Sequence, residues 1–296
     1  MKRTLLFLVT NIAVMLTLGI VANLLCAFLG TSVAEVVGPE WANLLIFAFV
    51  YGMLGAFVSL LLSKPMAKMA CGARTIDGSE GEAERWLVAT VEDLARRANV
   101  KTPEVAIYPG AANAFATGAF RNSALVAVST DIMGQMSKEE LRAVLGHEMS
   151  HVANGDMVTL TLVQGVLNAF VIVISRVLAS VLANAGQKGE SRRSNGGLYF
   201  LLVMVLQLAL GVLASLVVFW FSRRREYAAD AGSAKLLGTP SAMIAALRRL
   251  GNLQPGVLPD SLKAMGIAEG KRTSIWSTHP SIEDRIEALQ NITFSM

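Results

Sequence analysis

Residues 137–151 of this chain read SKEELRAVLGHEMSH, and this stretch predicts a single amphipathic helix. Ser137 and Glu140 form a capping-box pattern, in which each side chain accepts a hydrogen bond from the other residue's backbone N–H at a helix start. The leucine and valine residues that follow recur at helical spacing, so they can bury one side of the helix. His147 and His151 are four residues apart, which places both imidazoles on the same helix face.

Two imidazoles on one helix face, with a glutamate beside the first, form the pattern of a catalytic zinc site. We expect His147 and His151 to bind zinc and Glu148 to act as the base on a water molecule at the metal. A structural zinc site, the alternative for a non-enzymatic membrane scaffold, is closed by four protein ligands that are usually rich in cysteine. Neither Cys26 nor Cys71 lies near the motif, and Glu148 would have no purpose in such a site.

A catalytic zinc site needs a third protein ligand and an open fourth position. The metzincin pattern requires glycine at position 154 and histidine at position 157, and this chain has Asn154 and Met157 there. The remaining candidates for the third ligand are Asp156, Glu226, Asp230 and His279. Glu226 is favoured, because Glu226 and Asp230 are four residues apart on an expected helix. Glu226 can then bind zinc while Asp230 accepts the second ring N–H of a ligand histidine.

The composition points to a membrane protein. Of the 296 residues, 53% are hydrophobic and 16% are charged, against about 25% charged residues in an average soluble domain. The apolar excess lies in four blocks that are long enough to span a membrane: Leu5–Leu29, Trp41–Leu62, Met157–Ala185 and Leu198–Phe221. This distribution excludes intrinsic disorder, a disulfide scaffold and a simple soluble enzyme. The basic connection 186–197 leaves open a second hairpin that is only partly embedded, or one that packs on the soluble part.

The apolar blocks divide the chain into four regions. We expect an N-terminal transmembrane hairpin in residues 1–62, the first part of a catalytic domain in 63–157, a second apolar hairpin in 158–221, and the second part of the catalytic domain in 222–296. Lysine and arginine flank the first hairpin, whereas its short connection carries only glutamates. The positive-inside rule then places the N-terminus and the catalytic parts in the cytoplasm.

The charged residues exclude two further classes of protein. The net charge is +4, but lysine and arginine cluster beside the apolar blocks, which is typical of membrane anchoring and not of nucleic-acid binding. The blocks themselves contain almost no ionisable side chain apart from Arg176, which argues against a transporter. The role of Arg176 is left open by the sequence.

The soluble regions show mixed helix and strand patterns. Ser79 and Glu82 form a second capping-box pattern, which predicts a helix that continues to about Asn99. The sequence also predicts strands at Glu104–Tyr108 and Ser123–Thr130 and helices at Glu226–Leu237, at Pro240–Leu250 and after Pro280. Residues 251–278 are rich in glycine and proline and are expected to form a long irregular connection.

Four motifs together resemble one known family. They are N-A-F-A-T-G at 113–118, H-E-M-S-H at 147–151, R-E-Y-A-A-D at 225–230 and T-H-P-S at 278–281. In this order they are similar to those of the HtpX heat-shock membrane metalloproteases, which are related to the CAAX prenyl endopeptidases. The resemblance covers essentially the whole chain, including both apolar hairpins.

This resemblance implies an α-helical membrane protein with four apolar helices in two hairpins and an α+β zincin-like (gluzincin) catalytic domain in the cytoplasm. It implies a multi-pass zinc endopeptidase of the bacterial inner membrane that takes part in quality control and the stress response. His147, His151 and Glu226 would hold one Zn²⁺ per subunit, with Glu148 as the catalytic base. The implied partners are membrane-protein or unfolded polypeptide substrates, the lipid bilayer and other membrane quality-control proteases.

Two motifs outside the zinc ligands suggest further site residues. Asn113, Ala114 and Phe115 are similar to the substrate-binding edge strand of thermolysin-like enzymes, where an extended peptide pairs with the strand backbone. The alternative is an ordinary loop with Phe115 in the core. His279 is similar to a residue near the zinc in relatives and could stabilise the oxyanion, although an ordinary helix start explains the sequence there too. Arg285 is expected to brace this segment against a carboxylate.

Overall fold

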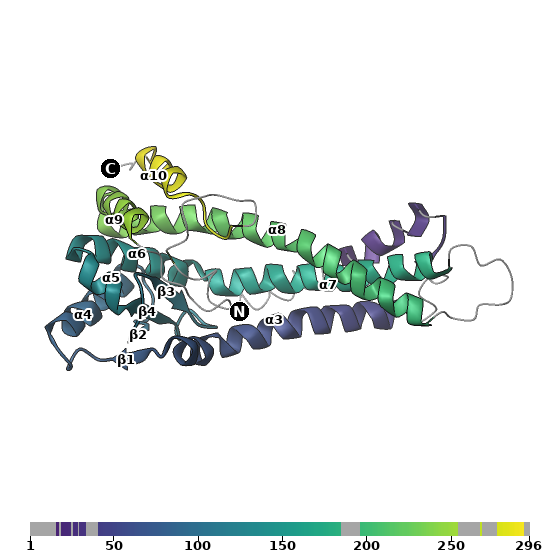
Figure 1. Cartoon of the computed structure of the whole chain (residues 1–296), viewed down its shortest axis with the longest axis horizontal. Helices are drawn as coiled ribbons and strands as arrows, with labels where there is room; N and C mark the ends of the chain where they lie inside the picture. Colours follow the sequence, from purple (N-terminus) through teal and green to yellow (C-terminus); the bar gives the residue numbers. More distant parts are fainter. Residues whose placement is uncertain are drawn as a thin grey trace. The chain divides into compact units, whose positions relative to one another are not determined.

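The structure is a computed structural model of the whole chain and describes residues 16–17, 19–24, 26–28, 30–33, 41–184, 196–253, 267 and 277–292 (Figure 1). The chain forms two compact units, and each is assembled from two separate stretches of sequence. One unit comprises Met1–Phe57 and Thr161–Val217, and the other comprises Val58–Leu160 and Val218–Met296. The first unit is almost entirely apolar, and the second contains all the motifs singled out above.

Three helices in the described part of the chain are long and apolar enough to cross a membrane. They are α3 (Trp41–Cys71), α7 (Asp156–Asn184) and α8 (Gly196–Leu237). They contain the second and fourth apolar blocks of the sequence and the third as far as Asn184. Most of the first block lies outside the described residues, and its described part includes a shorter apolar helix at Gly19–Phe28. The count of four apolar helices therefore stays a prediction.

Small residues hold α3 and α7 together in the apolar unit. A methyl group at Gly52 of α3 would lie 2.7 Å from the backbone nitrogen of Ala169 of α7. A methyl group at Gly165 of α7 would lie 2.5 Å from the sulfur of Met53 of α3. The two backbones thus approach closely, as helices in membranes commonly do through small residues.

Arg176 is accommodated inside the same unit by neighbouring groups. Its guanidinium lies 5.4 Å from the centre of the Phe47 ring of α3, and it donates a hydrogen bond to the carbonyl of Ile172. A cation above an aromatic face is attracted by the ring quadrupole, which offsets part of the cost of burying the charge. The structure thus gives Arg176 a packing role within the helix pair.

The apolar helices continue into the second unit without a break. The predicted separation between an apolar block ending at Phe221 and a soluble helix starting at Glu226 is wrong, because α8 is one helix of 42 residues. No glycine or proline lies between these two residues, so nothing in the local sequence interrupts the helix. Likewise, α3 extends past Leu62 to Cys71, and there Lys64 and Lys68 form ion pairs with Glu104.

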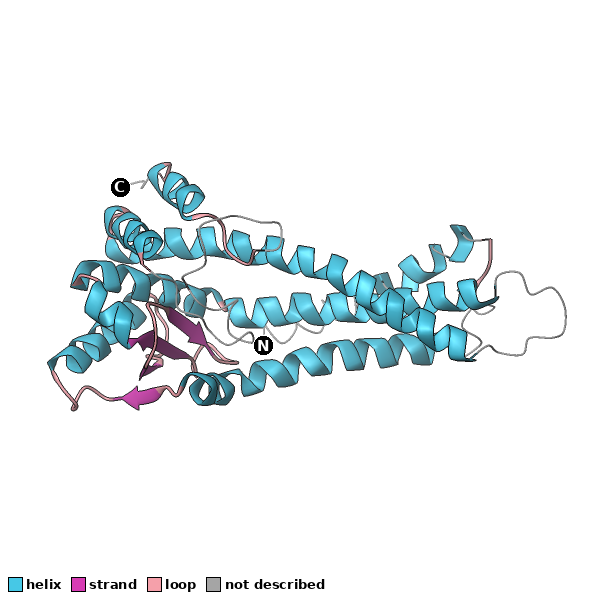
Figure 2. Ribbon diagram, in the orientation of Figure 1, coloured by secondary structure: helices cyan, strands magenta, loops and turns pink. Residues whose placement is uncertain are grey.

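A four-stranded sheet forms the centre of the second unit (Figure 2). Its strands are β1 (Arg74–Ile76), β2 (Glu104–Tyr108), β3 (Ala114–Thr117) and β4 (Leu125–Ser129), in the order β1-β2-β4-β3. β2 and β4 run parallel, while β1 and β3 pair antiparallel with them at the two edges. The predicted strand Glu104–Tyr108 is confirmed. The N-A-F-A-T-G motif supplies the edge strand β3.

Five helices complete this unit: α4 (Glu82–Arg97), α5 (Thr130–Gln135), α6 (Lys138–Asn154), α9 (Ser241–Asn252) and α10 (Ile282–Gln290). Buried side chains from α4, the sheet, α6 and α9 form one continuous apolar core. The capping box of Ser137 and Glu140 is present at the start of α6. The second predicted capping box is wrong, because α4 begins after Gly81 without a side-chain cap. Glu80 instead accepts hydrogen bonds from the backbone of the preceding turn.

Candidate metal centre and active site

The central part of the site is built on α6. One helical turn separates His147 and His151, and their Nε2 atoms lie 3.1 Å apart. Both imidazoles are almost completely buried, with 1% and 5% exposure. α6 ends at Gly155, whose φ of 71° is the left-handed conformation that glycine adopts without strain. The chain can therefore turn at once into α7, which begins at Asp156.

Small residues bring α8 against α6. A methyl group at Gly146 would lie 2.8 Å from the hydroxyl of Ser233, and one at Gly232 would lie 2.5 Å from the hydroxyl of Ser150. The Ser233 hydroxyl also donates a hydrogen bond of 2.7 Å to the carbonyl of Ala143. This close packing places the carboxyl-terminal part of α8, including Glu226, beside the histidines.

Glu226 completes a group that could hold a metal ion. One carboxylate oxygen lies 3.3 Å from the Nε2 atom of His147, and the other lies 3.3 Å from the Nε2 atom of His151. One ligand atom from each of the three residues lies within 4.8 Å of the others. Of the four candidates for a third ligand, Glu226 is the one that faces both Nε2 atoms.

The other ring nitrogens face two further carboxylates. Asp230 lies 2.9 Å from the Nδ1 atom of His147, and Asp156 lies 2.6 Å from the Nδ1 atom of His151. Carboxylates in this position fix the orientation of a ligand histidine and raise its basicity. The arrangement at Asp230 is the predicted one. The sequence suggests Asp156 only as a candidate third ligand, and its position beside His151 depends on the turn at Gly155.

Two buried arginines balance these carboxylates. Arg285 is 1% exposed and forms a two-pronged ion pair with Asp230, with N–O distances of 2.8 and 2.7 Å. Arg285 thus lies against a carboxylate, as expected. Arg225 has its Nε atom 3.4 Å from Asp156 and is also buried. Its place in a basic run after an apolar block indicated membrane anchoring, whereas the structure turns it toward the site.

The charges of the site favour a bound cation. Its buried carboxylates belong to Glu148, Asp156, Glu226 and Asp230, and its buried guanidiniums belong to Arg225 and Arg285. With both histidines neutral, the carboxylates exceed the guanidiniums by two charges. The same carboxylates stabilise positive charge at this place. Although burial alone would lower the pKa of His151, Glu226 and Asp156 raise this pKa to about 10. Two imidazole nitrogens and a carboxylate are also the donor set that zinc accepts. The residues present therefore fit a divalent metal ion.

Glu148 lies on α6 between the two histidines and faces the edge strand. It is 1% exposed, and burial raises the pKa of its carboxyl. The backbone N–H of Ala116 in β3 donates a hydrogen bond to this carboxylate. Its Oε2 atom has no hydrogen-bond partner among the described residues. A positioned carboxylate with a raised pKa and a free oxygen has the properties of a general base.

Of the predicted substrate-binding residues, Ala114 and Phe115 lie on β3 and Asn113 directly precedes it, but all three side chains are buried. The Phe115 ring packs 5.5 Å from the Tyr108 ring in the core, as in the alternative interpretation of this motif. The outer edge of the strand is also partly occupied. The N–H of Ile267 lies 3.1 Å from the Ala114 carbonyl and 3.0 Å from the Asn113 side-chain oxygen, and donates to both. Only the backbone of this segment is therefore available for a substrate.

His279 lies next to the metal-ligand group. Its Nε2 atom is 3.7 Å from a carboxylate oxygen of Glu226, and its Nδ1 atom is 2.9 Å from the Thr278 hydroxyl. Arg223 of α8 holds the segment in place through a hydrogen bond of 2.8 Å to the carbonyl of Ser277. The following helix α10 is capped by Ser281. The segment is thus both a helix start and a part of the site.

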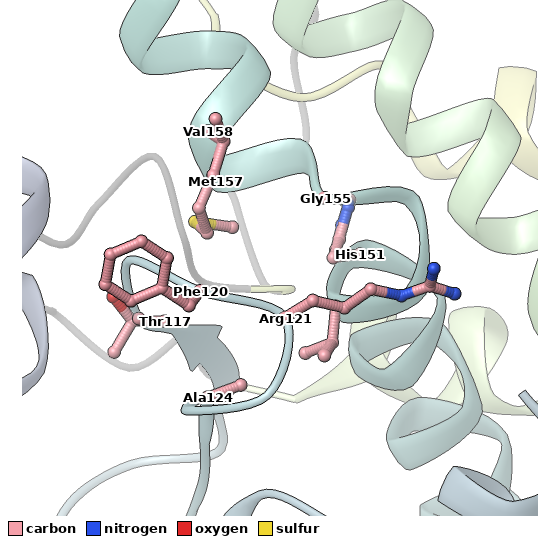
Figure 3. A pocket seen from close by; sticks show the side chains of 10 residues that line it. Thr117, Phe120, Arg121, Ala124, His151, Gly155, Met157 and Val158 are labelled. Atoms are coloured by element: carbon pink, nitrogen blue, oxygen red, sulfur yellow. The ribbon is translucent and has the colours of Figure 1, made fainter. Parts of the chain in front are cut away.

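A hollow that the motifs did not reveal opens beside His151 (Figure 3). Its empty volume is about 260 Å³, including the open mouth. The lining residues include His151 and Val152 of α6, Met157 and Val158 of α7, and Phe120 and Arg121 of the turn between β3 and β4. These residues are called the His151 pocket below. No sequence signal connects them, because three separate segments meet there.

Comparisons with known proteins agree on one family. The model of Peptidase family M48 matches residues 82–293. The chain is 53% identical over 295 residues to the "Protease HtpX homolog" of Verminephrobacter eiseniae, with 98% of this chain and 99% of that protein covered. It is 53% identical over 294 residues to the protein of the same name from Albidiferax ferrireducens, with 98% and 99% covered.

Among solved structures, the chain is similar in fold to S. mikatae Ste24p, with a TM-score of 0.59 and 18% sequence identity. The similarity covers 95% of this chain and 66% of the Ste24p chain. At this level of identity the likeness concerns the fold alone. It agrees with the mainly helical architecture and the candidate membrane helices described above.

Proposed function

This chain belongs to peptidase family M48 and is an HtpX-like membrane metallopeptidase, and on that premise we propose a more specific function. It is a zinc-dependent endopeptidase of gluzincin type that hydrolyses peptide bonds of misfolded or damaged membrane proteins. It acts at the cytoplasmic face of the bacterial inner membrane, as part of protein quality control and the stress response. Its four apolar helices form two hairpins that interrupt the catalytic domain.

The main support for this function is the group of His147, His151 and Glu226. One possible ligand atom from each of these residues lies within 4.8 Å of the other two. Zinc accepts this set of ligands and keeps a further position open for catalysis. When bound, zinc supplies Lewis-acid activation of water and of the scissile carbonyl. A structural site for a non-enzymatic scaffold fits less well, because it would be closed by a fourth protein ligand and would not need Glu148.

Glu148 acts as the general base. It accepts a proton from the attacking water at its free Oε2 atom and then delivers this proton to the leaving amine. The hydrogen bond from the Ala116 N–H keeps the carboxylate turned toward β3, along which the substrate is held. Burial raises the pKa of Glu148, so the carboxylate is a stronger base than an exposed glutamate.

His279 stabilises the oxyanion that forms on the substrate carbonyl. Its side chain lies at the edge of the ligand group, 3.7 Å from Glu226. The Thr278 hydroxyl and the link from Arg223 to Ser277 hold it there before substrate binds. A donor that is already positioned in a buried site stabilises developing charge without a reorganisation cost.

The substrate binds as an extended strand along β3. Backbone pairing is tolerant of sequence, which suits an enzyme that cleaves many unfolded segments. A substrate that reaches Ala114 must replace the hydrogen bond from Ile267. The net contribution of such a bond is about 1 kcal/mol, so the replacement is readily offset by new backbone pairing.

The helices themselves support an action on membrane proteins. Glu226 lies on α8, the same helix that carries the fourth apolar block, and Asp156 is the first residue of α7. The candidate metal centre therefore includes residues of two candidate membrane helices. The basic residues that flank the apolar blocks favour a cytoplasmic position for this centre under the positive-inside rule.

The test compares two conservative variants of the purified full-length protein in detergent. Glu148→Gln keeps the shape of the side chain but cannot take up the proton, so we expect bound zinc with no cleavage of casein. Glu139→Gln changes an exposed glutamate on the same helix and should behave like the wild type. Substantial casein cleavage by Glu148→Gln would remove Glu148 from the role of base.

A further inference from the structure

We propose that Arg176 recognises membrane substrates by an acidic side chain within their transmembrane segment. The substrate class is a membrane protein that presents an unpaired aspartate or glutamate to the lipid, and this carboxylate pairs with the Arg176 guanidinium inside the bilayer. The inference rests on the proposed endopeptidase function, because it describes how that activity selects its membrane substrates. It assigns a binding site to the apolar unit, which contains none of the metal-ligand residues.

Arg176 is a charge that the apolar unit leaves without a counterion. In the described parts of Met1–Phe57 and Thr161–Val217, no other lysine or arginine and no aspartate or glutamate occurs. The guanidinium therefore has no carboxylate partner in this part of the chain. A charged side chain at membrane depth is costly, and such residues commonly pair with another charged group.

Most donor groups of the Arg176 guanidinium are not used. The Nη1 atom donates one hydrogen bond of 3.3 Å to the Ile172 carbonyl, and the Cζ atom lies 5.4 Å from the centre of the Phe47 ring. Within the described residues the side chain makes no other hydrogen bond and no ion pair. A guanidinium has five N–H donors in a planar fork that matches a carboxylate. The remaining donors can therefore form a two-pronged pair with an incoming carboxylate.

The guanidinium is accessible at the surface of the apolar unit. Arg176 is half-buried, and the Phe47 ring next to it is 44% exposed. Tyr51 stacks on Phe47 with 5.0 Å between the ring centres and is 65% exposed. A transmembrane helix of another protein can therefore approach Arg176 along the aromatic face of α3. The two rings would surround the ion pair with apolar contacts.

The depth of Arg176 favours a protein side chain over a lipid headgroup. The Ile172 carbonyl lies twelve residues before Asn184, the last residue of α7, which is about 18 Å along the helix. Phe47 lies six residues after Trp41, the first residue of α3, which is about 9 Å. Both values place the guanidinium in the hydrocarbon layer, below the level of an interfacial tryptophan. Lipid phosphates lie outside this layer, whereas side chains of transmembrane segments lie within it.

An acidic side chain exposed to lipid marks a membrane protein that has lost its partner. Acidic residues in transmembrane segments almost always face the interior of a helix bundle and pair there. Misfolding or dissociation of the bundle turns such a residue toward the lipid. A second copy of this chain offers no carboxylate from the described residues of its apolar unit. The ligand that fits Arg176 is therefore a misassembled membrane protein, in agreement with the proposed role in quality control.

The experiment uses the full-length, zinc-loaded protein in phosphatidylcholine vesicles. Each model substrate has one transmembrane helix of leucine and alanine and a flexible tail with a cleavage sequence taken from casein. The helices differ at one position at the depth of Arg176, which is leucine, asparagine, aspartate or lysine. We expect kcat/KM to be about tenfold higher for aspartate than for leucine, because a charged hydrogen-bonded pair forms. Asparagine should give a smaller gain, and lysine should give none.

Three variants on α7 test whether Arg176 makes the selection. Arg176→Leu removes the charge and should abolish the difference between the aspartate and leucine substrates. Arg176→Lys keeps the charge but loses the planar fork, so it should restore part of the difference. Asn168→Leu removes a neutral polar side chain that pairs with Gln164 on the same helix, and it should keep the wild-type preference. Zinc content and circular dichroism check that each variant is folded.

The outcomes separate this inference from the proposed function. A wild-type protein that binds no zinc and cleaves neither casein nor any model substrate contradicts the endopeptidase function, and this inference with it. Cleavage of all four model substrates at equal rates overturns recognition by Arg176, while the endopeptidase function stands. A folded Arg176→Leu protein that keeps the preference for aspartate has the same consequence.

A lipid headgroup at Arg176 would give a different result. Phosphatidylglycerol in the vesicles would then raise the unfolding midpoint of the wild type but not of Arg176→Leu, and the model substrates would be cleaved without preference. This combination would assign Arg176 to lipid binding and overturn the inference. We expect instead that the preference for aspartate persists when phosphatidylglycerol is added.

Discussion

Replacement of Arg285 by methionine tests the buried ion pair that orients the metal-ligand histidine His147. The Arg285 guanidinium is 1% exposed and pairs with both oxygens of Asp230, which in turn lies 2.9 Å from the Nδ1 atom of His147. Methionine fills a similar volume but leaves the Asp230 carboxylate buried without its cation. Loss of one partner of a buried ion pair typically costs about 3–5 kcal/mol.

The same change should weaken metal binding. Partners that orient a ligand histidine typically contribute a factor of about 10–100 to metal affinity. We therefore expect Arg285→Met to lower the midpoint of thermal unfolding and to raise the zinc dissociation constant within that range. Chelator competition measures the affinity, and circular dichroism follows the unfolding.

Two further variants make the result specific. Arg96→Met breaks an exposed ion pair with Asp93, which contributes up to about 1 kcal/mol, so it should change neither quantity much. The double variant with Asp230→Asn and Arg285→Met removes both buried charges and should recover part of the lost stability. If Arg285→Met binds zinc and unfolds like Arg96→Met, the reasoning about the buried pair is refuted.

Three further substitutions test other parts of the site. Gly232→Val should separate α8 from α6, since even a methyl group there lies 2.5 Å from Ser150, and zinc content should drop; Gly134→Ala, which meets open space, is the control. Asp156→Ala should retain zinc stoichiometry but bind it about 10–100-fold more weakly in chelator competition; unchanged affinity would exclude a role in orienting His151. Ala114→Pro should slow casein cleavage more than Ala114→Ser, because proline deletes a backbone donor on β3. Equal rates in two folded variants would mean that the substrate binds elsewhere.

The parts of the site that follow from local chemistry could be predicted from the sequence. A capping box and a four-residue spacing are properties of a single helix, so Ser137 marks the start of α6 and His147 and His151 share one face. Glu226 and Asp230 follow the same spacing on α8, and the structure turns them toward different nitrogens of the histidines. Helical periodicity predicts that each pair shares one face of its helix, whereas the packing of α8 on α6 brings the two faces together.

Features that depend on packing between distant segments could not be predicted. Arg225 is the last residue of a basic run, and only the position of α7 shows that it faces Asp156 instead of a membrane surface. Phe115 lies in a motif that suggests substrate contact, yet its ring is held in the core by Tyr108. The His151 pocket likewise exists only because the turn after β3 meets α6 and α7.

The proposed zinc-dependent activity depends most directly on Glu226 as the third protein ligand of zinc. Metal analysis of purified wild-type protein and Glu226→Ala, with folding checked by circular dichroism, tests this point. We expect one zinc ion per chain in the wild type and almost none in the folded variant, because the Asp230 and Asp156 carboxylates face the Nδ1 atoms of the histidines and not the Nε2 atoms. Full zinc retention by Glu226→Ala would contradict the proposed ligand set and point to Asp156, Asp230 or His279 instead.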